Sequence, residues 1–262
     1  MNPLRPRFAR RPPGAALARY VECYWALTAD AAPPWKSRIL PDGSNDVILD
    51  FAEPRCFVVG VMHRADLVPL AGSVDLLGVR FRPGGALPFL GVPLHELADR
   101  HVLLDELWGS RAATLLDAVA AAPLRERVSV LERMLVASRA PALADDDLIA
   151  RAVTLLRRTR GGIGIRAAAQ ALGVGERRLE RAFDVAIGLS PKRFARVVRF
   201  LGAVREIGRH ALRPGAALAY TAGYADQPHF VREFKRLAGV TPAQYAAERR
   251  VGIVQDEDPL PA

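Results

Sequence analysis

The sequence predicts an α+β protein with two parts. The N-terminal part is predicted to be a β-rich, barrel- or sandwich-like domain followed by a helical connector, and the C-terminal part to be all α. Short runs rich in β-branched residues, bounded by Pro, Gly and Asp, occupy the first part, and helical apolar spacing replaces them from Arg111 onward. The charge divides similarly, because residues 151–250 carry 20 Lys and Arg against 7 Asp and Glu, whereas the rest of the chain carries 17 against 21.

We predict four segments within the 262 residues. Residues 1–110 form the β-rich domain, which is the candidate effector or regulatory domain, and residues 111–143 form the helical connector and linker. Residues 144–250 form the C-terminal helical domain, and residues 251–262 form a flexible tail. The stretch APALADDD sets the main boundary, because Pro141 indicates a linker and the aspartates favour the positive end of a helix dipole.

The N-terminal strands are predicted from the runs VILDF, CFVVGVM and VDLLGVRF. The connector is predicted to contain two helical stretches with a break near Ala122-Pro123, since proline removes a backbone donor. Its apolar positions are Leu115, Leu116, Val119, Val128, Leu131 and Leu135.

The C-terminal domain contains the stretch GYADQPHFVREFKRLAGVTPAQY, which predicts a turn, a helix and the start of another helix. The apolar positions repeat at i, i+4 and i+7, as Phe230, Phe234 and Leu237. Asp226 is placed to cap the helix N-terminus and Gly239 to end the helix in a left-handed conformation. Pro242 suits the first turn of the following helix, where a missing N–H costs nothing.

The same pattern occurs twice in the C-terminal domain. At an offset of 51 residues, Leu179 aligns with Phe230, Arg181 with Arg232, Phe183 with Phe234, Gly188 with Gly239, Pro191 with Pro242 and Phe194 with Tyr245. We therefore predict two helix-turn-helix units, in which small residues let the helices cross closely. These small residues are Ala168, Ala171, Gly173, Ala219, Ala222 and Gly223.

The stretch PKRFARVVRFLGAVREIGRHAL between the units is predicted to be one long helix. A helix of roughly 20 residues spans about 30 Å. Two recognition helices reach successive major grooves on one face of a DNA duplex when they are about 34 Å apart. The basic charge and this spacing together favour DNA as the partner.

Residues 144–250 resemble the DNA-binding domain of AraC/XylS-type transcription regulators. The second unit of that family reads close to G-[FY]-x-[DS]-Q-x-[HY]-F-x-R-x-F-[KR]-x-x-x-G-x-[TS]-P-x-x-[YF]. The matching residues are Gly223, Tyr224, Asp226, Gln227, His229, Phe230, Arg232, Phe234, Lys235, Gly239, Thr241, Pro242 and Tyr245. The first unit is a looser match. The segments YVECYW, ILPDGSNDVILDF and GVRFRPGGALPFLGVPLHEL resemble an uncharacterised domain often fused to such regulators, which implies an architecture but no ligand.

Six residues of the two recognition helices are predicted to contact bases: Arg177, Glu180, Arg181, Gln227, His229 and Arg232. Arginine pairs with the guanine edge, glutamate accepts from cytosine, and glutamine suits adenine. For each residue the alternative is a solvated side chain or an ion pair within the domain. For Arg232, a structural ion pair with a neighbouring carboxylate stays open.

Five further basic residues are predicted to contact phosphates, which fix register without reading sequence: Lys192, Arg193, Arg196, Lys235 and Arg236. Their alternative role is simple solubility.

Four residues of the N-terminal domain are weaker candidates for binding an anionic effector: Arg80, Arg82, Asp42 and Asp46. Arg80 and Arg82 alternate along a predicted strand, so they would share one face. Turn formation also explains the Asp42-Gly43 pair without any ligand.

No catalytic residue, metal ligand or cofactor is predicted. Cys56, Met62 and His63 lie close in sequence, but no Cys or His pair has zinc-ligand spacing, and neither a serine nucleophile elbow nor a phosphate loop occurs. The alternative function, a cupin-like or DNA-modifying enzyme with a DNA-binding tail, would require such residues.

The sequence also predicts where the protein acts. No run approaches about 18 uninterrupted apolar residues, and the start MNPLRPRFARRPPG lacks the apolar core of a signal peptide. Two cysteines do not make a disulfide framework. We expect a bacterial, cytoplasmic transcription regulator that binds double-stranded DNA and no membrane, acts as a monomer or homodimer, and has RNA polymerase as a partner. Its N-terminal domain would sense a small molecule, mediate self-association, or both; control by abundance alone is the alternative.

Overall fold

The computed structural model describes residues 7–140, 146–210 and 215–250. The N-terminal elements are β1 (Arg7–Arg11), β2 (Val21–Ile39), β3 (Asp46–Asp50), β4 (Arg55–Val59), β5 (Asp66–Phe81), α1 (Leu87–Leu90), η1 (Leu94–Leu97), β6 (His101–Leu103), α2 (Leu104–Trp108), α3 (Ser110–Ala120), η2 (Leu124–Glu126) and α4 (Arg127–Ser138). The C-terminal elements are α5 (Asp146–Arg158), α6 (Ile165–Ala171), α7 (Glu176–Ala186), α8 (Pro191–His210), α9 (Ala216–Thr221), α10 (Gln227–Ala238) and α11 (Pro242–Arg250). The predicted tail, 251–262, and Pro141 of the predicted linker lie outside the described residues.

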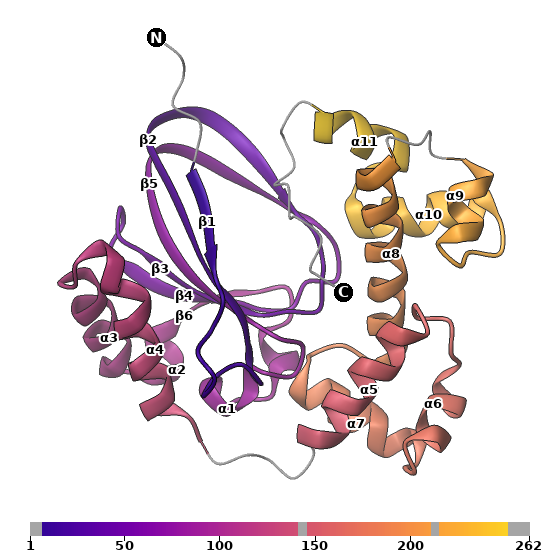
Figure 1. The fold of residues 1–262 in the computed structure, drawn as a ribbon, viewed down its shortest axis with the longest axis horizontal. Helices are drawn as coiled ribbons and strands as arrows, with labels where there is room; N and C mark the ends of the chain where they lie inside the picture. The colour runs from indigo at the N-terminus through magenta and orange to yellow at the C-terminus, as the bar shows by residue number, and fades with distance from the viewer. Residues whose placement is uncertain (1–6, 141–145, 211–214, 251–262) are drawn as a thin grey trace.

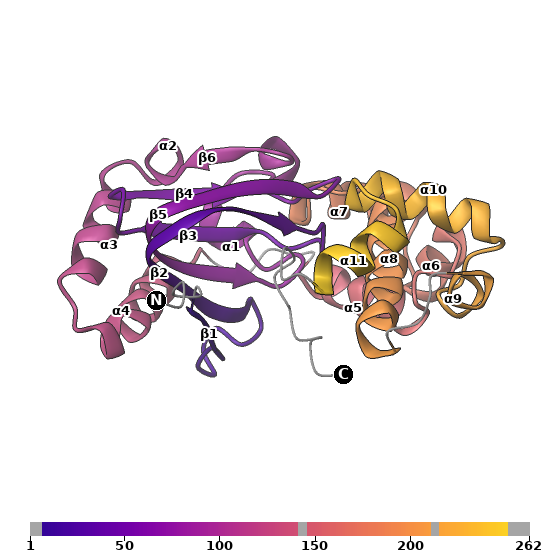
Figure 2. The ribbon, with the colours of Figure 1, turned by 90° about the horizontal axis from the view of Figure 1, so that it is seen from above.

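Within the described residues, the N-terminal strands form a six-stranded sheet of order β1-β2-β5-β3-β4-β6, and every pair of neighbouring strands is antiparallel. The predicted α+β class is confirmed. The expectation of short strands is wrong for β2 and β5, which extend over 19 and 16 residues. Register shifts in their pairing let these two long strands bend, and the sheet curves strongly (Figures 1 and 2).

The connector helices pack on the sheet. The chain breaks between α3 and α4 at the predicted place, since α3 ends at Ala120 and η2 begins after Pro123. Leu115, Leu131 and Leu135 are buried in the same apolar cluster as the strands. The connector therefore contributes to the N-terminal core.

The C-terminal helices are arranged around α8. Helices α5 to α7 lie at one end of α8 and α9 to α11 at its other end, beside the sheet (Figure 1). One apolar cluster runs from Leu17 through the sheet and the first unit to Val198, whereas a second cluster, which includes Phe200, Phe230 and Tyr245, belongs to the second unit. The division at residues 110, 143 and 250 stays a prediction, and the apolar packing crosses it. Of the described helices, none is long and apolar enough to cross a membrane.

Candidate nucleic-acid interface

The first helix-turn-helix unit consists of α6 and α7. The buried side chains of α7 are Leu179, Ala182, Phe183 and Ala186. The three base-contact candidates of this helix, Arg177, Glu180 and Arg181, are exposed. Because the apolar face of α7 packs against the core, its charged face is exposed and can enter a groove as wide as that of a DNA duplex.

The second unit consists of α9 and α10, and its predicted caps are confirmed. The Asp226 side chain accepts a hydrogen bond from the His229 backbone N–H at 2.6 Å, and Gly239 ends α10 with φ of +77°. Gln227 and Arg232 are exposed. Arg232 has no carboxylate partner among the described residues, so the structural ion pair considered for it does not form there. His229 is half-buried, with its ring edge-on to Tyr224 at 5.4 Å between centroids.

The small residues of the two units divide into two groups, and Ala171, which is exposed, does not belong to the buried group. Ala168, Ala219 and Ala222 are buried where the helices meet, which fits a close crossing. Gly173 and Gly223 are exposed, and a Cβ on either glycine would meet no atom within 4 Å. Close packing is therefore the wrong explanation for the glycines; they adopt φ of +72° and +79° in the turns, a conformation that suits glycine.

The predicted phosphate contacts also separate into two groups. Lys192 and Lys235 are exposed. Arg193, Arg196 and Arg236 instead line a cavity that the N-terminal domain closes on its other side. Of these five residues, the three arginines therefore share a cavity with the N-terminal domain, whereas the two lysines do not line it.

A buried carboxylate, Glu233, organises three of the predicted contacts. Its side chain is 7% exposed, and its Oε2 lies 3.6 Å from Arg196 Nε, 3.7 Å from Arg236 Nη2 and 3.9 Å from His229 Nε2. Burial raises the pKa of the Tyr224 phenol, and the negative charge of Glu233 raises it further. Sequence reasoning missed Glu233, although position 233 lies on the helix face that Phe230 and Leu237 define.

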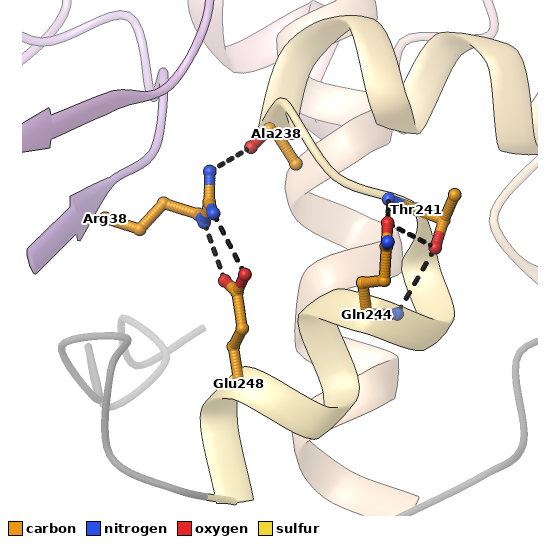
Figure 3. A network of polar contacts seen from close by, with 5 residues as sticks. All are labelled: Arg38, Ala238, Thr241, Gln244 and Glu248. Atoms are coloured by element: carbon orange, nitrogen blue, oxygen red, sulfur yellow. Dashed lines mark hydrogen bonds and ion pairs between the residues drawn. The ribbon is translucent and has the colours of Figure 1, made fainter.

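The N-terminal domain contacts both units. Arg38 of β2 pairs with Glu248 of α11 and donates to the Ala238 carbonyl at the end of α10 at 2.8 Å (Figure 3). The Ala65 N–H donates to the Leu237 carbonyl at 2.6 Å. These donors satisfy carbonyls that the last turn of a helix leaves without an internal partner.

Contacts with the first unit lie near the end of α7. His95 Nδ1 lies 3.3 Å from Asp184 Oδ2. Gly188, at φ of +85°, is so close to the Leu94 carbonyl that a Cβ would come within 2.7 Å of its oxygen. The N-terminal domain thus contacts the C-terminal end of α7 through η1, and it contacts the C-terminal end of α10 through Arg38 and Ala65.

The effector candidates do not gather at an open site. Arg80 Nη1 lies 3.2 Å from Asp42 Oδ2, and its Nε lies 3.4 Å from Asp46 Oδ1. Asp46 also accepts a hydrogen bond from Trp25 Nε1 at 2.7 Å. β5 ends at Phe81, and Arg82 donates instead to the Ala18 carbonyl at 2.9 Å. Three of the four side chains are therefore paired with one another, and an effector role for the four stays a prediction.

Two family models match the chain. Residues 9–103 match a domain of unknown function, DUF6597, and residues 168–248 match a helix-turn-helix domain. No curated protein matches.

Several solved structures are similar. An AraC-type transcriptional regulator from Chromobacterium violaceum is 23% identical, with 38% of this chain and 89% of that chain covered and a TM-score of 0.36. A probable AraC family regulator from Rhodopseudomonas palustris is 22% identical, with coverage of 39% and 96% and a TM-score of 0.35. ToxT from Vibrio cholerae is 12% identical, with coverage of 94% and 98% and a TM-score of 0.42.

The helix-turn-helix match and the residues of the second unit define the C-terminal domain. The C-terminal part of the chain contains a helix-turn-helix DNA-binding domain of the AraC type, and residues 9–103 form the DUF6597 domain.

Proposed function

We propose that one chain reads two successive major grooves of an asymmetric DNA site through α7 and α10. The observation that carries this proposal is the single helix α8, whose 20 residues separate two units with exposed polar faces. At 1.5 Å per residue this helix is about 30 Å long, close to the about 34 Å between successive major grooves. Arg177, Glu180 and Arg181 read one groove, and Gln227, His229 and Arg232 read the next.

The phosphate contacts of this complex come first from Lys192 and Lys235. Arg193, Arg196 and Arg236 join them when the N-terminal domain leaves room for the duplex. Because such contacts release counterions, the affinity falls steeply as salt concentration rises. A rigid α8 also requires the DNA to bend, at a cost of about 1–6 kcal/mol.

We also propose that DUF6597 senses a small molecule or mediates self-association. The contacts of Arg38, Ala65 and His95 with the two units support this role, because a change in the N-terminal domain reaches both recognition helices. We place the protein in the cytoplasm, as a monomer or homodimer, with RNA polymerase as its protein partner.

The two-groove proposal is tested by selecting bound sequences from a random duplex pool with the intact protein. We expect a motif of two blocks with centres about one helical turn, 10 bp, apart. The double variant Arg177→Ala/Arg181→Ala should lose the information in one block, and Gln227→Ala/Arg232→Ala should lose the other. A motif with a single block that only one double variant erases would contradict reading by both helices.

A further inference from the structure

A cavity of about 580 Å³ lies between the N-terminal domain and the C-terminal helices. One wall consists of the chain around Gly60–Asp66 and Asp99–His101, and the other consists of side chains from α8 and α10. Its volume is typical of a small-molecule site. Because it lies between the two domains, any ligand in it would contact both of them.

Positive charge dominates the lining. Among the described residues, five arginines line the cavity: Arg64, Arg100, Arg193, Arg196 and Arg236. The lining carboxylates are Asp66 and Asp99, and Glu233 lies behind Arg196 and Arg236. Five cations against these three anions leave a net charge of +2, with histidines counted as neutral.

The carboxylates of the lining already have partners. Asp99 contacts the His63 ring through its Oδ2 and the His63 backbone N–H through its Oδ1, and Asp66 lies 3.9 Å from His101 Nε2. Arg100 donates to the Glu96 carbonyl at 3.1 Å. Within the described residues, the side chains of Arg64 and Arg193 have no hydrogen-bonding or ion-pair partner. One guanidinium from each domain is thus available in the same cavity.

We infer that this cavity binds a small, multiply charged oxyanion, a molecule that carries phosphate groups or several carboxylates, through Arg64 and Arg193. A guanidinium offers a planar fork of donors that matches the oxygens of these groups. Because charged side chains lie on both walls, the cavity favours a short, charged ligand over a long hydrocarbon chain. The inference rests on the proposed sensing role and gives it a site and a ligand class.

Ligand binding at this place has a physical consequence for the domain interface. Anionic oxygens between the two walls offset the repulsion among the arginines and add contacts to both domains. The site lies beside the hydrogen bond from Ala65 to Leu237 that joins the N-terminal domain to α10. The bound anion therefore favours the docked arrangement described above.

The test uses the intact protein with sodium pyrophosphate as the phosphate probe and sodium citrate as the carboxylate probe, each against sodium chloride of matched ionic strength. Calorimetry gives the affinity, and thermal unfolding gives the shift of Tm. We expect saturable binding of at least one probe with a rise in Tm. Arg64→Ala and Arg193→Ala should each weaken binding about tenfold or more, since a hydrogen bond to a charged group is worth about 1.5–3 kcal/mol.

Arg133→Ala is the matched control, because Arg133 is exposed on α4, away from the cavity. It should bind the probes like the wild type. Arg64→Gln removes the charge with less change of shape, and its circular dichroism spectrum and Tm without probe should match the wild type. The inference would be overturned if neither probe bound or raised Tm more than sodium chloride does. It would also be overturned if Arg64→Ala and Arg193→Ala both bound the probes with wild-type affinity.

The DNA-binding proposal is judged separately. Arg64 belongs to the N-terminal domain and is not one of the predicted DNA contacts. Arg64→Ala should therefore keep the affinity for the selected DNA site measured without any probe. Loss of probe binding with normal DNA binding supports the cavity site, whereas absence of DNA binding in the wild type counts against the proposed function alone.

Discussion

Arg38 and Glu248 form a bidentate ion pair between β2 and α11 (Figure 3). Arg38 Nε lies 2.8 Å from Glu248 Oε2, and Arg38 Nη2 lies 3.0 Å from Glu248 Oε1. The third nitrogen, Nη1, donates to the Ala238 carbonyl. The Arg38 side chain is 8% exposed and that of Glu248 is 24% exposed. All three guanidinium nitrogens thus serve the contact between residues about 200 positions apart in the chain.

Arg38→Ala should lower the free energy of unfolding by about 3 kcal/mol, because it leaves the Glu248 carboxylate poorly solvated and unpaired. Urea denaturation followed by circular dichroism gives this value. Arg38→Met/Glu248→Leu removes both charges and should cost less than Arg38→Ala alone. A loss below about 0.5 kcal/mol for Arg38→Ala would show that the pair behaves like an exposed surface ion pair.

Gly188 and Gly173 provide a matched pair of substitutions. Both have positive φ, but only a Cβ at Gly188 would approach another backbone, the Leu94 carbonyl. Gly173→Ala should cost about 1–2 kcal/mol for the left-handed conformation alone. Gly188→Ala should cost clearly more and loosen the contact between η1 and α7, as increased amide hydrogen exchange there would show. An equal loss of unfolding free energy in the two variants would mean that the Leu94 backbone moves away from the new Cβ at little energetic cost.

Arg181→Ala and Lys192→Ala should affect DNA binding in different ways. Arg181 is proposed to read a base, so its loss should cost about 1–3 kcal/mol on the selected site and relax specificity at one position. Lys192 is proposed to contact phosphate, so its loss should weaken specific and random duplexes alike and reduce the slope of log affinity against log salt by about 1. Fluorescence anisotropy titrations on both duplexes measure this. An equal loss of affinity for both duplexes in Arg181→Ala would show that Arg181 contacts phosphates and no base.

Cys56 should make stability depend on alkaline pH. Burial raises the pKa of its thiol to about 12, with the nearby negative charge of Asp105 as the smaller cause. The unfolded thiol ionises near its ordinary pKa of about 8.5, so the stabilising contribution is fully present below that pH and is lost as the pH rises toward 12. The free energy of unfolding should fall between pH 8.5 and 10.5. Cys56→Ala should flatten this fall whatever its effect at pH 7, and an unchanged slope would contradict the assignment.

Local sequence was sufficient for the second helix-turn-helix unit. The Asp226 cap, the Gly239 terminus and the buried face of Phe230, Phe234 and Leu237 depend on residues within a few positions of one another. The same holds for the long helix α8 and for the break after Ala120. Such features follow from helix periodicity and capping, which act over one or two turns.

Contacts between distant segments were not predictable in this way. The sequence indicated Arg193, Arg196 and Arg236 as phosphate contacts, but it did not show that the N-terminal domain faces them across a cavity. It also grouped Arg80 with Arg82, whereas Arg80 is neutralised by Asp42 and Asp46. The partner of a charged side chain depends on which segments the fold brings together.

The sequence by itself determined two helix-turn-helix units, their spacing along α8, their basic charge and their AraC-type character, because these properties come from periodic patterns and motifs along one continuous stretch. Only the tertiary structure decided the rest: Arg38 pairing with Glu248, Glu233 buried among three basic side chains, and Arg64 facing the same cavity as Arg193. The physical reason is that charge pairing and burial depend on distances in space, and packing sets those distances between residues that are far apart in the chain.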